Sequence, residues 1–229
     1  MTLCGRDLRN LSSDVGSMED VAQQVVTYFY DRLLDGENGS HACPLVRFFN
    51  TQLFGQLDEK LQQFAQNMMP ETPLHNNVNC LAMLATKGAD AAWNDRNGSE
   101  GHQAIPLPSE DAVGQIPMIA RLVHQLGIPV EQVIQPDTSL LLDDNEKEYG
   151  VFFVPDAQGS AYIPAQDFVE AHSIKSVIGF GGQLSTGNTF AVILFSRCKL
   201  SRQVADLFSS VALNVQIAVA PFTNRTFSD

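Results

Sequence analysis

The chain contains few basic residues and no long apolar segment. Its 14 Lys and Arg stand against 26 Asp and Glu, which gives a formal net charge of −12. Binding to a phosphate backbone requires a basic surface, so this balance argues against a nucleic-acid partner. No run approaches the roughly 20 apolar residues of a membrane helix, and the first residues, MTLCGRDLRNL, lack the apolar core of a signal peptide. We therefore expect a cytoplasmic protein without membrane insertion.

Closely spaced metal ligands are also missing. The four cysteines are Cys4, Cys43, Cys80 and Cys198, and no two of them form a C-x-x-C pair. Zinc sites usually show such pairs, and intracellular cysteines are usually free thiols. The acidic residues 143–148 lack the ligand spacing of a calcium loop, so we expect an exposed loop there. We predict no cofactor and no metal.

The common catalytic motifs are absent. There is no P-loop, no G-x-S-x-G and no H-E-x-x-H. Gly179, Gly181 and Gly182 lie close together, but a turn and a strand follow them. A dinucleotide fingerprint requires a helix that begins at the glycines. Without these motifs or a kinase core, the chain is expected not to be an enzyme.

What the sequence does contain is an alternation of strand and helix patterns. Ser17 and Asp20 have the spacing of a capping box, and apolar residues then recur at helical spacing toward Gly36. Further helices are predicted at residues 58–70, 109–127, 131–134 and 166–171, with Pro117 either bending the second of these or starting a new segment. Strands are predicted at residues 43–51, 80–86, 105–107, 139–143, 149–154, 174–181 and 189–196.

The last third of the chain has the clearest pattern. An apolar strand ends near Gly181, and the turn Thr186-Gly187-Asn188 leads into the apolar run of residues 189–196, which suits a buried central strand. Ser201 can cap a long final helix, and Pro221 ends it.

This order resembles the C-terminal half of a GAF domain, a sensory module of phytochromes, phosphodiesterases and bacterial histidine kinases. The resemblance rests on Ile174-Lys175-Ser176, on Gly187-Asn188 before the strand 190–195, on the helix 201–220, and on the strand 152–156, which ends in Asp. Upstream segments, such as residues 17–33 (SMEDVAQQVVTYFYDRL), resemble the N-terminal sensor region ahead of PAS and kinase modules in bacterial signalling proteins.

The resemblance implies an α/β (α+β) fold. A central mixed, mainly antiparallel sheet would have the N- and C-terminal helices on one face and a loop-covered pocket on the other. One sensor domain would span residues 17–222, with residues 1–16 a tail or short helix and residues 223–229 a polar tail or the start of a linker. The terminal helices would form a homodimer interface through Val25, Phe29, Leu207, Val211 and Val215.

Candidate pocket residues come from a polar, glycine-rich loop, because loops held on a rigid sheet often carry binding residues. The loop spans residues 92–103 and contains the single tryptophan, Trp93, together with Arg96 and His102. Trp93 could be a lid, a core anchor or a stacking platform for a ligand. Arg96 could bind an anion or pair with Asp95 or Glu100. His102 could donate into a pocket, bind haem in a large apolar pocket, or fix the loop. Tyr149 and Tyr162 are expected on facing segments.

Three functions remain open for such a domain. The first is a signal-sensing domain of a bacterial two-component system, which binds a small molecule and signals to a histidine kinase or PAS module. The second is a thiol reductase of the free methionine sulfoxide type, with Cys43 and Cys80 as its thiols. The third is a ligand-free dimerisation scaffold. The Cys-His pair of bilin-binding relatives and the N-K-x-n-F-x-x-x-D-E pattern of cyclic-nucleotide binders are absent.

Overall fold

A six-stranded antiparallel sheet forms the centre of the computed structural model, which describes residues 2–13, 15–37, 39–99, 101–137 and 150–228. The strand order is β3-β2-β1-β6-β5-β4, and the five pairings between these strands are all antiparallel. The mainly antiparallel sheet is thus confirmed, with no parallel pair among the described strands. The strands are β1 (Leu45–Leu53), β2 (Asn79–Gly88), β3 (Ala104–Pro106), β4 (Val151–Val154), β5 (Ser176–Gln183) and β6 (Thr189–Ser196). The strand expected at residues 139–143 lies outside the described residues.

The hairpin between β5 and β6 forms where the turn residues predict it. Gln183 and Thr189 are the last register partners of the two strands. Gly187 has a φ of +84°, a conformation that residues with a Cβ rarely adopt. The Leu184 N–H donates to Asn188 O at 2.7 Å, and this bond closes the turn.

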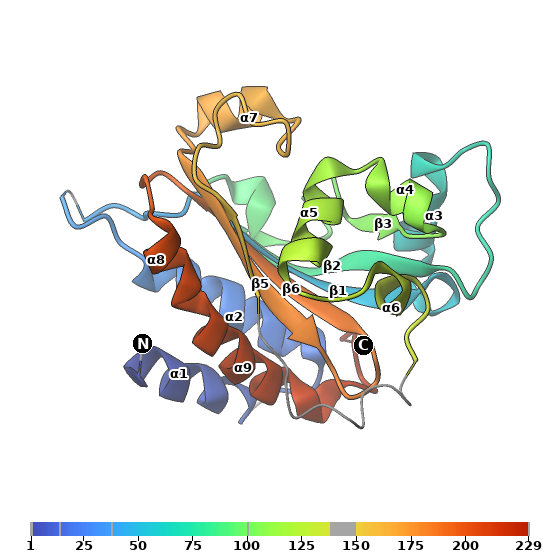
Figure 1. Ribbon diagram of the computed structural model, residues 1–229. Coiled ribbons are helices and arrows are strands. Elements are labelled where there is room, and N and C mark those ends of the chain that lie inside the picture. Colours follow the sequence, from blue (N-terminus) through green and yellow to red (C-terminus); the bar gives the residue numbers. More distant parts are fainter. Residues whose placement is uncertain (1, 14, 38, 100, 138–149, 229) are drawn as a thin grey trace.

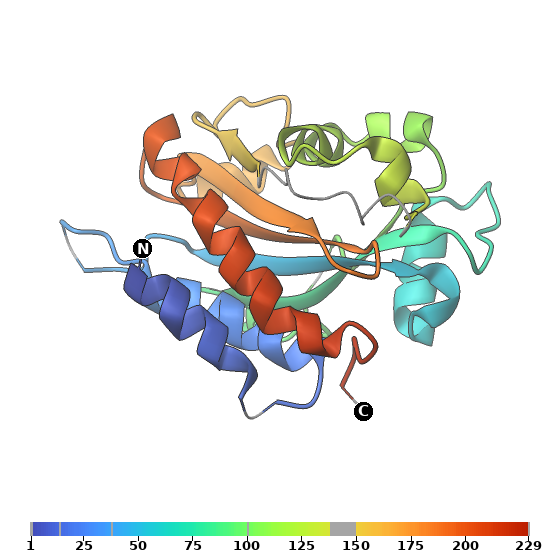
Figure 2. The ribbon, with the colours of Figure 1, turned by 60° about the horizontal axis from the view of Figure 1, so that its bottom comes forward.

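Terminal helices cover one face of the sheet, as the GAF resemblance implies. Helices α2 (Met18–Arg32) and α9 (Phe208–Val219) pack against the strands, and the short α8 (Arg202–Asp206) leads into α9. Helix α1 (Thr2–Arg9) packs on α9 (Figure 1, Figure 2). The predicted capping box of Ser17 and Asp20 is present at the start of α2. Phe29 of α2 packs edge-on against Phe180 of β5 with ring centroids 5.5 Å apart, which ties the helices to the sheet.

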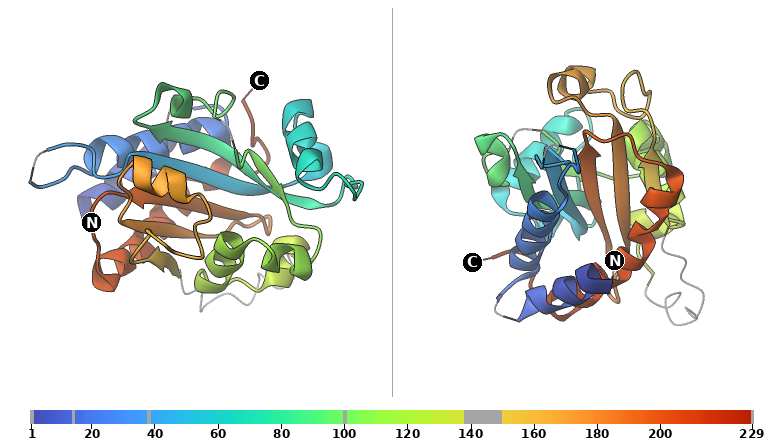
Figure 3. Two further views of the ribbon diagram at one scale, coloured as in Figure 1. Left: turned by 90° about the horizontal axis from the view of Figure 1, so that it is seen from above. Right: turned by 90° about the vertical axis from the view of Figure 1, so that its left-hand side faces the viewer.

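The other face carries shorter elements (Figure 1, Figure 3). Pro117 occupies the first turn of α5, so it starts a second helix and does not bend a continuous one. The elements are η3 (Ala91–Asn94), α4 (Glu110–Gly114), α5 (Pro117–Gln125), α6 (Val130–Ile134) and α7 (Gln166–Ala171). Helix α3 (Glu59–Met68), which follows η2 (Phe54–Gln56), lies instead on the face of the terminal helices (Figure 3). It packs on Cys80, Ala82 and Ala104, which alternate along β2 and β3 with the residues of the opposite face.

Both ends of the chain pack against the domain, and residues 1–16, expected as a tail or a short helix, contain helix α1. Leu8 of α1 is fully buried in the core beneath the helices. Near the C-terminus, the N–H groups of Met18 and Glu19 donate to the carbonyls of Arg225 and Thr226 at 2.8 and 2.9 Å. The folded unit therefore includes most of residues 1–16 and 223–229.

The predicted dimer residues are mostly part of the core. Val25, Phe29, Val211 and Val215 are buried between the helices and the sheet, because their helices turn these sides inward. Their side chains cannot contact a second copy, and the prediction is wrong for these four. Leu207 is exposed, as are two apolar residues of α9, Leu213 and Ile217.

The final helical stretch is longer and more apolar than the sequence analysis expected of any segment. Within the part of the chain that the structure describes, one stretch, Arg202–Phe222, is long and apolar enough to cross a membrane by length and composition, with a mean hydropathy of 1.4. In this structure the buried side of α9 faces the sheet.

Candidate functional site

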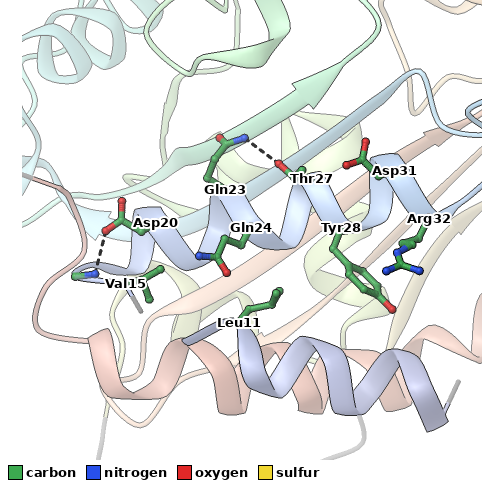
Figure 4. Close-up of a pocket in the computed structure, with 10 residues that line it drawn as sticks. Leu11, Val15, Asp20, Gln23, Gln24, Thr27, Tyr28, Asp31 and Arg32 are labelled. Carbon is green, nitrogen blue, oxygen red and sulfur yellow. Dashed lines mark hydrogen bonds between the residues drawn. The ribbon is translucent and has the colours of Figure 1, made fainter. Parts of the chain in front are cut away.

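One hollow among the described residues is a groove along α2. Its volume is about 690 Å³ and it opens broadly to solvent. Leu11, which follows α1, lies across from Gln24 and Tyr28 of α2 (Figure 4). Two of its polar groups already have partners, since the Asp20 carboxylate accepts from the Gly16 and Ser17 N–H groups and the Tyr28 hydroxyl donates to Asp7 Oδ2. The groove is thus a helix surface and not a formed site.

The second hollow is a more enclosed cavity on the opposite face of the sheet, with a volume of about 590 Å³. Binding sites for small molecules are typically enclosed, mostly apolar and of roughly 300–1,000 Å³. The cavity lies between the sheet, α5 and the segment that leads into α7. It is lined mainly by apolar side chains from these elements, among them Leu45, Phe49, Ile105, Ile119, Leu122, Ile193 and Phe195. We therefore take this cavity as the candidate site.

Strand β1 supplies a charged residue to the floor of the cavity. Leu45, Arg47 and Phe49 line the cavity, whereas Val46 and Phe48 belong to the core under the helices. This alternation follows from the two-residue period of a strand. Arg47 therefore projects toward the cavity from the middle of an otherwise apolar row.

Arg47 is buried and incompletely hydrogen-bonded. Only 8% of the residue is exposed, and its Nη2 donates to the Ser99 hydroxyl at 3.0 Å. Its Nε is buried without a partner, and no carboxylate of the described residues forms an ion pair with it. Burial lowers the pKa of the guanidinium to about 10, because removal of water disfavours its charge.

A second buried polar group lies beside Arg47. Thr86 of β2 is the register partner of Arg47, and directly opposed residues of antiparallel strands point to the same face of the sheet. The Thr86 hydroxyl is buried and has no hydrogen-bond partner among the described residues. Buried polar atoms are nearly always hydrogen-bonded in proteins. Two adjacent polar atoms on this face thus lack the partners that such atoms normally have.

His102 lies in an exposed position at the cavity lining, after a sharp turn of the chain. Gly101 and His102 have φ angles of +76° and +57°, and such a conformation is uncommon for a residue with a side chain. The pKa of His102 is lowered, first because the surrounding protein removes water from the imidazolium and second because Arg47 repels its charge. The neutral imidazole can donate or accept a hydrogen bond there.

Aromatic side chains close one end of the cavity. Trp93 of η3 packs against Phe168 of α7 with ring centroids 5.7 Å apart and against His172 at 4.6 Å. Phe168 in turn packs against Phe195 of β6 at 5.1 Å. Trp93 lies directly over Gly88, where an added Cβ would come within 2.7 Å of the indole ring. The single tryptophan of the chain is thus held in the cavity wall.

Gln166 shapes the segment that covers the cavity. Its Nε2 donates to the carbonyls of Ala157 and Ile163, and its Oε1 accepts from the Gly159 N–H at 2.7 Å. These bonds fold the chain ahead of α7 into a compact loop. They set the position of Ile163, Pro164 and Ala165, which line the cavity.

The structure places two of the five predicted pocket residues at the cavity and two elsewhere, and the fifth lies outside the described residues. Trp93 and His102 line the cavity, as expected. Arg96 instead pairs with Glu19 of α2 and with Asp58 ahead of α3, so its charge is already neutralised away from the cavity. Tyr162 is not among the lining residues, and its hydroxyl accepts from Arg121 Nη1 at 2.9 Å. Tyr149 lies outside the described residues.

The predicted pair of Cys43 and Cys80 is not suited to thiol exchange between the two residues. Cys80 pairs in register with Gln52 near the end of β1, whereas Cys43 precedes the start of that strand. At about 3.3 Å per residue the two lie roughly 30 Å apart along β1. Burial raises the pKa of each thiol to about 12, which disfavours the reactive thiolate. They cannot act as an attacking and resolving pair.

The sequence reasoning missed Arg47 and Thr86. Arg47 stands within the apolar segment CPLVRFFNT, and a charged residue in a strand that is otherwise buried is unusual. That contrast is a usable signal, since a buried arginine normally has an anionic partner. Thr86 carries no such signal, because threonine is common in strands.

Comparison with known proteins gives structural likeness only. No family model matches the sequence, and no curated protein matches it. Among solved structures, the phycocyanobilin-bound GAF domain of a cyanobacterial phytochrome aligns with a TM-score of 0.44 and 9% identity, covering 96% of this chain and 92% of that one. The GAF domain region of a protein from Geobacter sulfurreducens PCA aligns with a TM-score of 0.40 and 13% identity, covering 96% of both chains.

Likenesses this distant carry no conclusion about this chain. The architecture itself agrees with the α+β fold that the GAF resemblance of the sequence implies. The antiparallel sheet, the layer of terminal helices on one face and the covered cavity on the other are the features that the GAF resemblance implies.

Proposed function

We propose that this chain is a non-catalytic sensory domain that binds a small molecule in the cavity between the sheet, α5 and α7. The cavity itself carries the proposal. It is enclosed, mostly apolar and of ligand size, and its floor holds buried polar atoms without partners. A packed interior contains few voids larger than a water molecule, so a space of this kind is typical of a binding site.

The sheet offers a physical connection between the cavity and the helix layer. Arg47 and Phe49 face the cavity, and Phe48 between them stacks on Phe190 of β6 on the opposite face, with centroids 5.8 Å apart. A ligand that prefers one position of β1 would therefore also favour one packing of the helices. Differential affinity of this kind shifts the population between two states.

The helix layer is the part that would report ligand binding to a partner. We propose a homodimer through the terminal helices, with the exposed Leu207, Leu213 and Ile217 in place of the buried residues. In this proposal the domain works in the cytoplasm of a bacterial two-component system and signals to a histidine kinase or PAS module. The support is the sequence resemblance to the sensor regions that precede such modules.

Native mass spectrometry of the purified chain, combined with the emission of Trp93, tests ligand binding. A bound molecule should appear as added mass, and its release should change the emission of the single tryptophan in the cavity wall. Ala165 lines the cavity at an exposed position, and Ala165→Phe adds a ring there that should abolish the added mass. Ala171→Phe is the matched control, because Ala171 is an exposed residue of α7 that does not line the cavity.

The scaffold alternative predicts a different result. A cavity that serves only packing gives no added mass for either variant, and no compound of a neutral and anionic panel changes the emission of Trp93. That outcome would reject the sensory proposal. An unchanged adduct in Ala165→Phe would place binding elsewhere on the molecule.

A further inference from the structure

We propose that the ligand is an apolar carboxylic acid whose carboxylate binds Arg47 while its carbon skeleton fills the rest of the cavity. This inference rests on the proposed function and names the chemical class that the same cavity would take. It follows from the hydrogen bonds that Arg47 makes and lacks, and from the apolar character of the remaining wall.

The donor geometry of Arg47 is that of a site for a planar anion. A guanidinium has five N–H donors, and its fork matches the two oxygens of a carboxylate. Among the described residues, the one hydrogen bond of Arg47 joins Nη2 to Ser99, and Nε is buried without a partner. Nη1 makes no such bond and is not among the buried atoms, so a carboxylate in the cavity would accept from Nη1 and from the second hydrogen of Nη2. The bond to Ser99 would then hold the guanidinium in place for the anion.

The charge of Arg47 supports the same conclusion. Burial of an unpaired charge is costly, and proteins normally provide an opposite charge or hydrogen bonds. The ion pairs of the described residues involve Arg6, Arg96, Lys199 and Arg202 but not Arg47. Arg96, by contrast, has Glu19 and Asp58. A bound anion would supply the missing partner of Arg47.

The rest of the cavity limits the charge of the ligand. The described lining contains Arg47 and His102 as its ionisable groups, and most other lining side chains are aliphatic or aromatic. The neutral form of His102 is favoured, so it contributes a hydrogen bond more readily than a charge. A ligand with several negative charges would leave most of them buried against apolar carbon. A single carboxylate on an apolar body fits the whole lining.

Two pairs of compounds can separate the contribution of the charge to binding from that of the carbon skeleton. Octanoate and octanamide share a flexible chain, and 4-phenylbutyrate and 4-phenylbutanamide share an aromatic one. In each pair the amide keeps the shape but removes the charge. Isothermal titration of the full chain should show each carboxylate binding about 10- to 100-fold more tightly than its amide, because a charge-assisted bond is lost. A preference between octanoate and 4-phenylbutyrate would identify the skeleton.

Variants of Arg47 test the residue itself. Arg47→Met keeps much of the length without the charge, and it should remove the preference for the carboxylate over the amide. Arg47→Lys keeps a charge without the fork and should retain part of the preference. Arg96→Met is the control, because it removes an arginine outside the cavity, and it should leave both affinities unchanged.

Thermal unfolding without ligand distinguishes a binding arginine from a structural one. An arginine kept for a ligand leaves a buried charge unpaired, so Arg47→Met should have a melting temperature equal to or above that of the original chain. Its stabilisation by octanoate should be lost. A lower melting temperature together with an unchanged carboxylate preference would overturn the inference.

The outcomes also separate this inference from the proposed function. Equal binding of carboxylates and amides, insensitive to Arg47→Met but abolished by Ala165→Phe, would reject the anionic ligand and retain the binding cavity. Absence of binding by all four compounds, together with absence of any copurified ligand in native mass spectrometry, would reject both.

Discussion

The two faces of the sheet are built from the same strands and differ in how completely they are packed. On the helix face, Val46 and Phe48 of β1 meet α2 and the ring of Phe190 in a continuous core. On the cavity face, Leu45, Arg47 and Phe49 line an open space of about 590 Å³. The strand sequence alternates between the two environments at every residue.

The difference shows where the fold obtains stability and where it can bind a ligand. Long helices with continuous apolar sides fill the space over one face. Short helices and loops cover the other, where α5 and α7 leave room between them. We expect substitutions on the helix face to change stability and substitutions on the cavity face to change binding.

The largest effect should come from a charge placed on the buried side of α9. Val215→Asp puts an unpaired carboxylate in the core and should lower the free energy of unfolding by at least about 4 kcal/mol. Ser210→Asp, at an exposed position of the same helix outside the proposed dimer residues, should change it by less than about 0.5 kcal/mol. Urea unfolding of both variants measures the contrast, and similar losses would contradict the assignment of the buried side.

Neighbouring residues of β6 should respond differently to added volume. Val192 faces the helix core, and Val192→Phe should cost about 1–3 kcal/mol through overpacking. Ile193, the register partner of Arg47, lines the cavity, so Ile193→Phe should cost less than about 1 kcal/mol and should weaken ligand binding. Urea unfolding measures the stability of the two variants, and titration with octanoate measures their ligand affinity. Equal destabilisation would mean that the cavity cannot accept a larger side chain.

The two arginines offer a contrast in stability. Arg96 joins the 92–103 loop to α2 through Glu19, and its guanidinium lies over the Phe227 ring at 5.2 Å. Loss of this half-buried pair in Arg96→Met should lower the free energy of unfolding by about 1–3 kcal/mol. Arg47→Met should not lower it. A larger loss of stability in Arg47→Met than in Arg96→Met would contradict this account, because Arg47 would then be the structural arginine.

A smaller effect is expected on the titration of His102. The positive charge of Arg47 contributes to its lowered pKa, so Arg47→Met should raise that pKa toward the ordinary value of about 6.5. The pKa rises because removal of the positive charge of Arg47 makes the positively charged imidazolium more stable. NMR titration of the ring protons measures the shift, and His102→Gln assigns the signal among the five histidines. An unchanged pKa would show that the two side chains do not interact.

Much of the fold was predictable because it depends on local signals. The capping box at Ser17, the turn at Gly187 and the apolar run in β6 each determine a local conformation, and all three are confirmed. The side of a helix that becomes buried depends on what packs against it, which is why Val211 and Val215 were assigned to a surface. Long-range contacts decided the site as well. Arg96 found Glu19 at a separation of 77 residues, and Arg47 became the charged residue of the cavity.

Methyl-resolved NMR during a titration with octanoate tests the central claim most directly, because it reports on both faces of the sheet at once. The account predicts the largest shifts at Ile119 and Ile193, smaller ones at Val192, and loss of the response in Arg47→Met. Largest shifts on the helix face, or none on the cavity face at saturating octanoate, would contradict the account.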